Sequence, residues 1–156
     1  MDEFALADQY LDSGNGKEAM RIFRTLAERG RVDAMHSIAH THLYGIAGIR
    51  RDYTEAFTWF TKAARNGCPQ AMYHLGLMNE EGLGIPANPK AALDWYQKSA
   101  QRGDEDAEYR VGLCHERGVG TTANIEEAEK WYRLAAAHGQ EDAKARLATL
   151  SGREPE

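Results

Sequence analysis

The stretch ALDWYQKSA at residues 92–100 decides the fold, because it has two close copies, AFTWFTKAA at residues 56–64 and AEKWYRLAA at residues 128–136. The copies begin 36 residues apart and contain all three tryptophans of the chain. In each copy, an aromatic pair and the alanines three to four positions away lie on one stripe of a helix. Self-similarity at this period is typical of a solenoid of stacked helical hairpins, so we expect an all-α fold.

The tryptophans of this motif are predicted to be core residues. A single hairpin cannot bury the aromatic stripe alone, so the large residues of one layer must pack against small residues of the next. We therefore expect Trp59, Trp95 and Trp131 to lie in the core. A ligand-binding aromatic box is the alternative interpretation of the same three residues.

The residues around each copy complete a helical hairpin. Helix-start signals precede the three copies: Asp52 with Glu55, Asn88 before Pro89, and Asn124 with Glu127. Upstream, a small–aliphatic–small pattern that allows close helix packing occurs at residues 34–39, 71–76 and 107–112. Glycine-bearing loops at residues 45–48, 82–84 and 118–120 permit the tight return between the two helices.

The two ends of the chain carry partial copies of the same pattern. Residues 1–33 resemble a degenerate hairpin, and Ala143 begins a lone helix one period after Ala107. These patterns predict a single domain over residues 1–150. Its parts are a degenerate hairpin at 1–33, full repeats at 34–70, 71–106 and 107–142, and a capping helix at 143–150, followed by a frayed tail at 151–156.

The composition is that of an ordinary soluble protein. Of 156 residues, 42% are hydrophobic and 28% are charged, and the net charge of −5 argues against a nucleic-acid or anionic-membrane partner. No apolar run approaches the length of a membrane span, and the acidic N-terminus shows no secretory signal. We therefore expect a cytoplasmic protein. Cys68 and Cys114 are predicted to be reduced thiols, since neither a zinc-type cluster nor a sign of export is visible.

Several motif positions recur together and resemble the Sel-1-like repeat, a relative of the tetratricopeptide repeat. Residues 71–103 match that pattern almost throughout: Ala71, Leu75, Gly76, Gly82, Gly84, Pro86, Lys90, Ala91, Trp95, Tyr96, Lys98, Ala100 and Gly103. The resemblance implies a right-handed superhelical solenoid of antiparallel helix pairs, which serves as an adaptor or scaffold, often in bacteria. Two departures stand out. His42, Asn79 and His115 occupy a position where the family often has Tyr, and Cys68 and Cys114 lack the spacing of its disulfide-bridged branch.

In the related tetratricopeptide architecture, the first helices line a concave face, and positions there that packing does not need can contact a ligand. Helical spacing places nine residues of this chain in that predicted groove: His36, His40, Leu43, Tyr73, Leu77, Glu80, Tyr109, Leu113 and Glu116. Four neighbours are predicted at its rim: His74, Glu81, Arg110 and Arg117. The alternative for Tyr73 and Tyr109 is that they pack between helices as core.

Other chemistry has weaker support in the sequence. His36 and His40 are four residues apart and could share a metal ion, but a third ligand would have to come from elsewhere, such as His74 or Glu80. The sequence GVGTT at residues 118–122 lacks the lysine of a phosphate-binding loop. We therefore predict no metal site, no cofactor and no enzymatic activity.

The sequence thus predicts a protein–protein interaction module. Its partner is expected to be another protein or peptide, and the chain itself a monomer or weak homo-oligomer. A bacterial immunity or effector-associated regulatory protein is the main alternative, and rests on the family resemblance alone. A metal-binding or hydrolytic protein centred on His36 and His40 is a third possibility.

Overall fold

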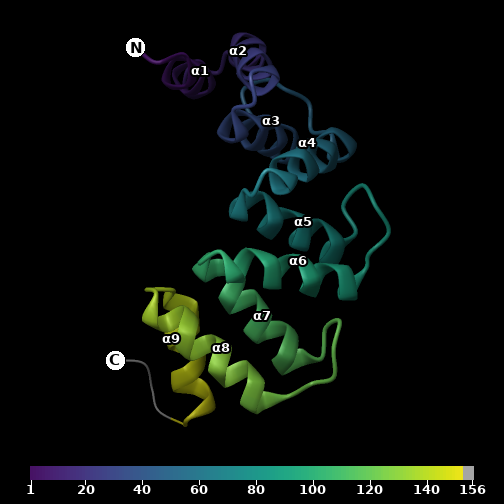
Figure 1. The fold of residues 1–156 in the computed structure, drawn as a ribbon, viewed down its shortest axis with the longest axis vertical. Helices are drawn as coiled ribbons and strands as arrows, with labels where there is room; N and C mark the ends of the chain where they lie inside the picture. Colours follow the sequence, from purple (N-terminus) through teal and green to yellow (C-terminus); the bar gives the residue numbers. More distant parts are fainter. Residues whose placement is uncertain (153–156) are drawn as a thin grey trace. The chain divides into compact units, whose positions relative to one another are not determined.

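The computed structural model describes residues 1–152, and this range folds into nine α-helices without any strand (Figure 1). Their bounds are α1 Glu3–Asp12, α2 Gly16–Glu28, α3 Val32–Tyr44, α4 Tyr53–Arg65, α5 Pro69–Glu81, α6 Pro89–Gln101, α7 Glu105–Arg117, α8 Ile125–Ala137 and α9 Glu141–Leu150. The predicted class, an all-α solenoid of helix pairs, is confirmed. Most of the predicted tail, residues 153–156, lies outside the described range.

The helices start where the sequence signals lie. Asp52, Asn88 and Asn124 each accept a hydrogen bond from the backbone N–H three residues later, which satisfies one unpaired donor of the first helical turn. The first helices of the repeats, α3, α5 and α7, begin two residues before the alanines that mark the predicted boundaries at 34, 71 and 107. The single domain and its boundaries stay predictions.

The last turn of each first helix holds the start of the next helix through its backbone. The carbonyl oxygens of His42, Asn79 and His115 accept hydrogen bonds from the N–H groups of the capping residues Asp52, Asn88 and Asn124. Because the backbone makes this contact, the contact does not depend on which side chain stands at the position. The departure from the family's usual tyrosine therefore leaves this connection intact.

The second member of each aromatic pair fills the core. Phe60, Tyr96 and Tyr132 are completely buried, as is Phe23 in the N-terminal hairpin. The tryptophans beside them are only half-buried, so the prediction that they are core residues is wrong in part. Adjacent helical positions point about 100° apart, so only one residue of a pair can point between the helices. Lys62 and Lys98 cover the outer faces of the first two tryptophan rings, with their Nζ atoms 4.2 and 4.5 Å from the ring centroids of Trp59 and Trp95.

Two helical glycines make room for the buried tyrosines. A Cβ atom on Gly76 or Gly112 would lie 2.4 Å from the ring of Tyr96 or Tyr132. In α3 the equivalent residue is Ala39, and the residue equivalent to the two tyrosines is Phe60. In α5 and α7, the predicted small residue therefore marks the place where the aromatic ring of the second helix crosses the first helix.

Each glycine-bearing loop packs against the start of an earlier second helix. A Cβ on Gly84 would lie 2.7 Å from Cβ of Tyr53 in α4, and one on Gly120 would lie 2.4 Å from the carbonyl oxygen of Pro89 in α6. At the first loop the arrangement is reversed, because the glycine is Gly16 of α2, which lies against Ala47 and donates its N–H to the Ala47 carbonyl at 3.0 Å.

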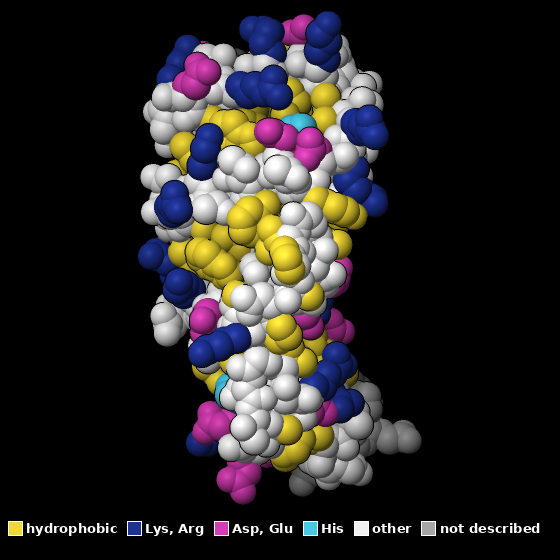
Figure 2. Space-filling model, turned by 90° about the vertical axis from the view of Figure 1, so that its right-hand side faces the viewer, with side chains coloured by type: hydrophobic (Ala, Val, Ile, Leu, Met, Phe, Trp, Pro, Cys, Tyr) yellow, Lys and Arg dark blue, Asp and Glu magenta, His cyan; other side chains and the backbone are white. Residues whose placement is uncertain are grey.

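The chain divides into two compact units. Unit 1 contains Met1–Ala71 with Leu83–Ile85, and unit 2 contains Met72–Gly82 with Pro86–Glu156. The face seen in Figure 2 carries both signs of charge with hydrophobic side chains between them. Within the described residues, none of the helices has the length and apolar character needed to cross a membrane.

Candidate interaction surface on the first helices

In unit 1, α3 carries a row of three aromatic side chains one turn apart, His36, His40 and Tyr44, which we call the α3 aromatic row. The ring centroids of His36 and His40 lie 6.0 Å apart, and those of His40 and Tyr44 lie 4.6 Å apart. Tyr44 is 48% exposed, and the two histidines are half-buried. Burial lowers the pKa of His40, so its ring is uncharged at neutral pH.

A groove of about 430 Å³ adjoins the His36 end of this row. It lies between α1, α3 and the turn from α4 to α5, and we call it the unit 1 groove. Its lining residues are Phe4, Val32, Asp33, His36, Ser37, Asn66, Gly67, Cys68, Pro69 and Gln70. The Cys68 thiol donates to Oε1 of Gln70 at 3.5 Å. The groove therefore combines an apolar floor with polar amides.

In unit 2, the predicted groove residues Tyr73 and Tyr109 are partly packed and partly accessible. Their ring centroids lie 5.9 and 5.6 Å from those of Tyr96 and Tyr132, and His36 contacts Phe60 in the same way at 5.7 Å. All three first-helix rings are half-buried. Packing against the second helix thus uses part of each ring and leaves part of it accessible.

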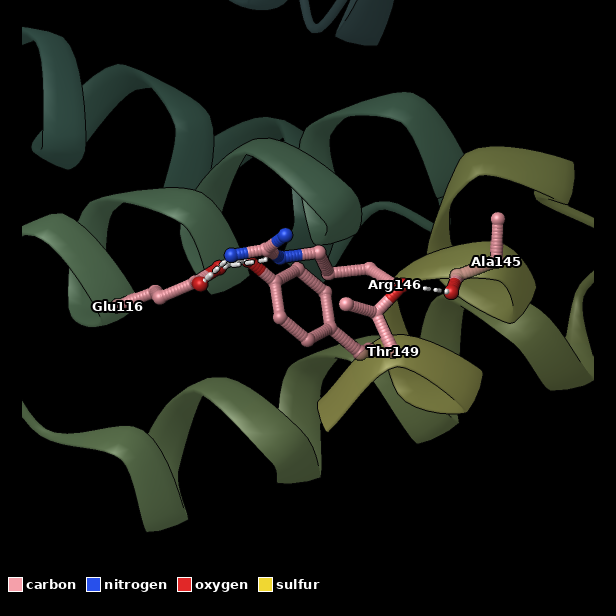
Figure 3. Close-up of polar contacts among 5 residues, drawn as sticks. Glu116, Ala145, Arg146 and Thr149 are labelled. Atoms are coloured by element: carbon pink, nitrogen blue, oxygen red, sulfur yellow. Dashed lines mark hydrogen bonds and ion pairs between the residues drawn. The ribbon is translucent and has the colours of Figure 1, made fainter. Parts of the chain in front are cut away.

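Glu80 and Glu116 occupy equivalent positions and make equivalent contacts. The Tyr96 hydroxyl donates to Glu80 at 2.5 Å, and the Tyr132 hydroxyl donates to Glu116 at 2.6 Å. An arginine from a following helix then contacts each carboxylate. Nη1 of Arg110 in α7 lies 3.9 Å from Oε2 of Glu80. Arg146 of α9 donates to both carboxylate oxygens of Glu116 (Figure 3).

This polar network changes the titration of its members. The Arg146 guanidinium, helped by the Tyr132 hydroxyl, holds the pKa of Glu116 below its usual range, although burial opposes the shift. Burial and the neighbouring carboxylates raise the pKa values of Tyr96 and Tyr132, so both phenols stay protonated donors. The two glutamates therefore tie neighbouring repeats together within unit 2.

The structure corrects two of the predicted groove residues. Leu43 is 5% exposed and Leu113 is 9% exposed, so both lie in the core rather than on an accessible face. Leu113 is buried because it packs in the cluster with Ala128, Tyr132 and Ala143, to which both α8 and α9 contribute. Leu77 is half-buried and packs against the cluster around Ala92 and Val111.

The predicted rim residues differ in accessibility. Glu81 and Arg117 are exposed, whereas His74 and Arg110 are half-buried. Arg110 is engaged by Tyr73 as well as by Glu80, and these partners raise its pKa although burial opposes the shift. The role of these residues in binding stays a prediction.

Sequence reasoning missed the groove beside His36 and the third ring of the aromatic row. The spacing of four between His40 and Tyr44 was a usable signal for the ring. Phe4 and Gln70 come from segments far apart in the sequence, so only the folded chain brings them to His36. Within residues 1–152, no group of three or more His, Cys, Asp or Glu side chains is arranged to hold a metal ion.

These features define a class of protein, the helical-hairpin repeat protein, in which architectural positions recur and surface positions vary. A family model described as Sel1 repeat matches residues 32–68, 69–104 and 105–140, which is more than half of the chain. The chain belongs to this family, as its resemblance predicted. The matched segments begin at the first residues of α3, α5 and α7.

Known proteins with similar sequences match over limited regions. The chain is 37% identical over 71 residues to HRD3A of Arabidopsis thaliana, an ERAD-associated E3 ubiquitin-protein ligase component, with 46% of this chain and 10% of that protein covered. It is 33% identical over 91 residues to the chitin synthase regulator SKT5 of Saccharomyces cerevisiae, with 55% and 13% covered. The chain thus spans only about a tenth of the length of these relatives.

Solved structures match over nearly the whole chain. The protective antigen c5321 of uropathogenic Escherichia coli is 29% identical, with a TM-score of 0.85 over 99% of this chain and 34% of that one. A Sel1 repeat protein from Oxalobacter formigenes is 27% identical, also with a TM-score of 0.85, over 99% of this chain and 66% of that one. Both similarities support the helix-pair fold.

Proposed function

We propose that this protein is an interaction adaptor that binds a segment of another protein on the accessible face of its first helices. Membership of the Sel1 repeat family and the similarity to HRD3A and SKT5 support a role in protein interaction. The chain covers only a small part of those proteins, so the proposal does not include their roles with a ubiquitin ligase or a chitin synthase. The net charge of −5 favours a protein partner over a nucleic acid or an anionic membrane.

One observation carries the proposal: Tyr73 and Tyr109 occupy the same position in successive first helices and are both half-buried. Each ring rests against a buried tyrosine, so its conformation is fixed before a partner arrives. A tyrosine held in this way offers apolar area and a polar hydroxyl at little entropic cost. Arg110 and Glu80 beside them supply charged groups that can select among partners.

The experiment is site-specific photo-crosslinking in a lysate of the source organism. A benzophenone amino acid is placed at Tyr73, at Tyr109 or, as a control, at the exposed Arg133 of α8. We expect the same partner to be crosslinked from the two first-helix positions and not from the control. A partner crosslinked from Arg133 alone would place binding on the second helices and overturn the proposal.

A bacterial immunity role, the absence of enzymatic activity and the oligomeric state stay predictions.

A further inference from the structure

The unit 1 groove and the α3 aromatic row form one continuous surface, because the His36 ring belongs to both. The groove supplies Phe4, Val32 and Pro69 as apolar lining, and the row continues from His36 to the exposed ring of Tyr44. None of these side chains belongs to the accessible surface around Tyr73 and Tyr109, which we call the tyrosine face of unit 2. The surface is therefore a second candidate site with its own chemistry.

This surface carries little uncompensated charge. The Asp33 carboxylate accepts two hydrogen bonds from Arg31 and one from the Ala34 N–H, and Arg31 lowers its pKa. The His40 ring is uncharged at neutral pH because it is half-buried. Unit 1 as a whole contains nine basic and nine acidic residues, so the entire net charge of −5 belongs to unit 2. A charged segment would gain no attraction here and would lose hydration on entering the groove.

The dimensions fit an extended peptide. From His36 to Tyr44 the helix rises about 12 Å, which corresponds to about four residues of a polyproline II segment. The volume of about 430 Å³ accommodates a few apolar side chains. Aromatic-lined grooves bind proline-containing segments because these are extended beforehand and lose little entropy. Asn66 and Gln70 also line the groove, and their amides are already engaged, by the Lys62 carbonyl oxygen and by the Cys68 thiol respectively.

Building on the proposed function, we propose that the unit 1 groove and the α3 aromatic row bind an uncharged, proline-containing extended segment of the partner protein. The rings of His36, His40 and Tyr44 contact the proline and aliphatic side chains. The absence of net charge in unit 1 selects against segments rich in Lys or Glu. The tyrosine face of unit 2 then contacts a different part of the partner.

Fluorescence anisotropy with three labelled decapeptides tests this inference. The first contains only Pro, Ala and Leu, with proline at every third position; the second and third replace two leucines by Lys or by Glu. Each is titrated with the whole protein and with the variants His40→Lys, Tyr44→Ala and, as a control in unit 2, Tyr109→Ala. The thermal midpoint of every variant is measured alongside.

We expect the neutral peptide to bind at least tenfold more tightly than either charged peptide. Tyr44→Ala should weaken it about three- to tenfold, in line with the loss of one aromatic contact. His40→Lys should weaken it further, because it puts a charge into the row, whereas Tyr109→Ala should leave the affinity unchanged. Since Tyr44 is exposed, its replacement tests the surface even if His40→Lys disturbs folding.

Three results would each overturn the inference. They are equal or tighter binding of a charged peptide, undiminished binding of the neutral peptide by Tyr44→Ala, and no binding of the neutral peptide by the unmodified protein. These results leave crosslinking from Tyr73 and Tyr109 untouched, so the inference and the proposed function can fail separately. A loss of peptide binding in Tyr109→Ala equal to that in Tyr44→Ala would move the peptide site to unit 2 and also contradict the inference.

Discussion

At the scale of single residues, the buried aromatic ring of each of the three full repeats changes together with two positions of the first helix. Tyr96 faces Gly76 and Glu80. In the repeat whose ring is Phe60, the equivalent positions hold Ala39 and Leu43. Tyr132 repeats the arrangement of Tyr96 with Gly112 and Glu116. A phenol hydroxyl needs both space and an acceptor, whereas a phenyl ring needs only apolar contacts.

This correspondence predicts a compensating pair of mutations. Tyr96→Phe removes the hydroxyl that Glu80 accepts from, so we expect a loss of about 1–2 kcal/mol in the free energy of unfolding. Adding Glu80→Leu recreates the combination found at Leu43 and Phe60 and should recover at least half of that loss. Urea unfolding of the single and double variants gives the measurement. A double variant less stable than Tyr96→Phe would refute the correspondence.

A second prediction concerns Gly112. Replacing a helical glycine by alanine ordinarily stabilises a helix by about 0.5–1 kcal/mol. Here the new methyl group would overlap the Tyr132 ring, so Gly112→Ala should instead destabilise the protein by about 1–3 kcal/mol. Thermal unfolding checks the sign. A raised midpoint would mean that the ring moves aside without cost.

At the scale of helices, α9 is attached to the rest of unit 2 through a polar contact as well as through packing. Ala143 is buried and Leu147 and Leu150 pack against the cluster around Tyr132, while Arg146 reaches Glu116 of α7. Ala145 and Thr149 on the other side of the helix are exposed. The distribution suits the predicted capping helix, which packs on one side and leaves small or polar residues on the other.

The Arg146–Glu116 contact predicts a pH dependence. Because the folded-state pKa of Glu116 is lowered, the unfolded chain binds a proton more readily, and the stabilisation is present above the usual glutamate range and lost as pH falls through the lowered value. Arg146→Ala should therefore lower the thermal midpoint at pH 7, by an amount equivalent to about 1 kcal/mol, and by clearly less at pH 3. Equal effects at both pH values would show that the contact acts through packing alone.

Helix existence and pairing could be predicted from the sequence because they depend on local signals. The caps at Asp52 and Asn124 and the 36-residue spacing specify the hairpins before any tertiary contact is known. The periodic pattern cannot decide which of two adjacent aromatics enters the core, so it predicts Trp95 inside, whereas Tyr96 fills that space. In the same way, the pattern predicts Leu43 and Leu113 on an open face, whereas both are buried.

At the scale of the whole molecule, the repeats interact mainly with their nearest neighbours, as expected for a solenoid. A local defect should therefore have local consequences. In Gly112→Ala, amide hydrogen exchange should accelerate in α7–α9 and remain unchanged in α1–α3, which belong to unit 1. Exchange measured by mass spectrometry resolves these segments. A uniform acceleration would mean that the two units unfold as one cooperative body.

The contact between each loop and the start of an earlier helix also restricts how such a chain can be lengthened or shortened. Each contact needs one residue without a side chain, supplied by the loop at Gly84 and Gly120 but by the helix at Gly16. Duplicating residues 69–104 would again place a loop glycine, equivalent to Gly84, against a helix start equivalent to Tyr53 or Pro89. The fit would therefore be preserved. Fusing the first loop to a later repeat would set Ala47 against Tyr53 or Pro89 with no glycine on either side. Repeats can thus be copied within the later part of the chain more readily than across its first junction.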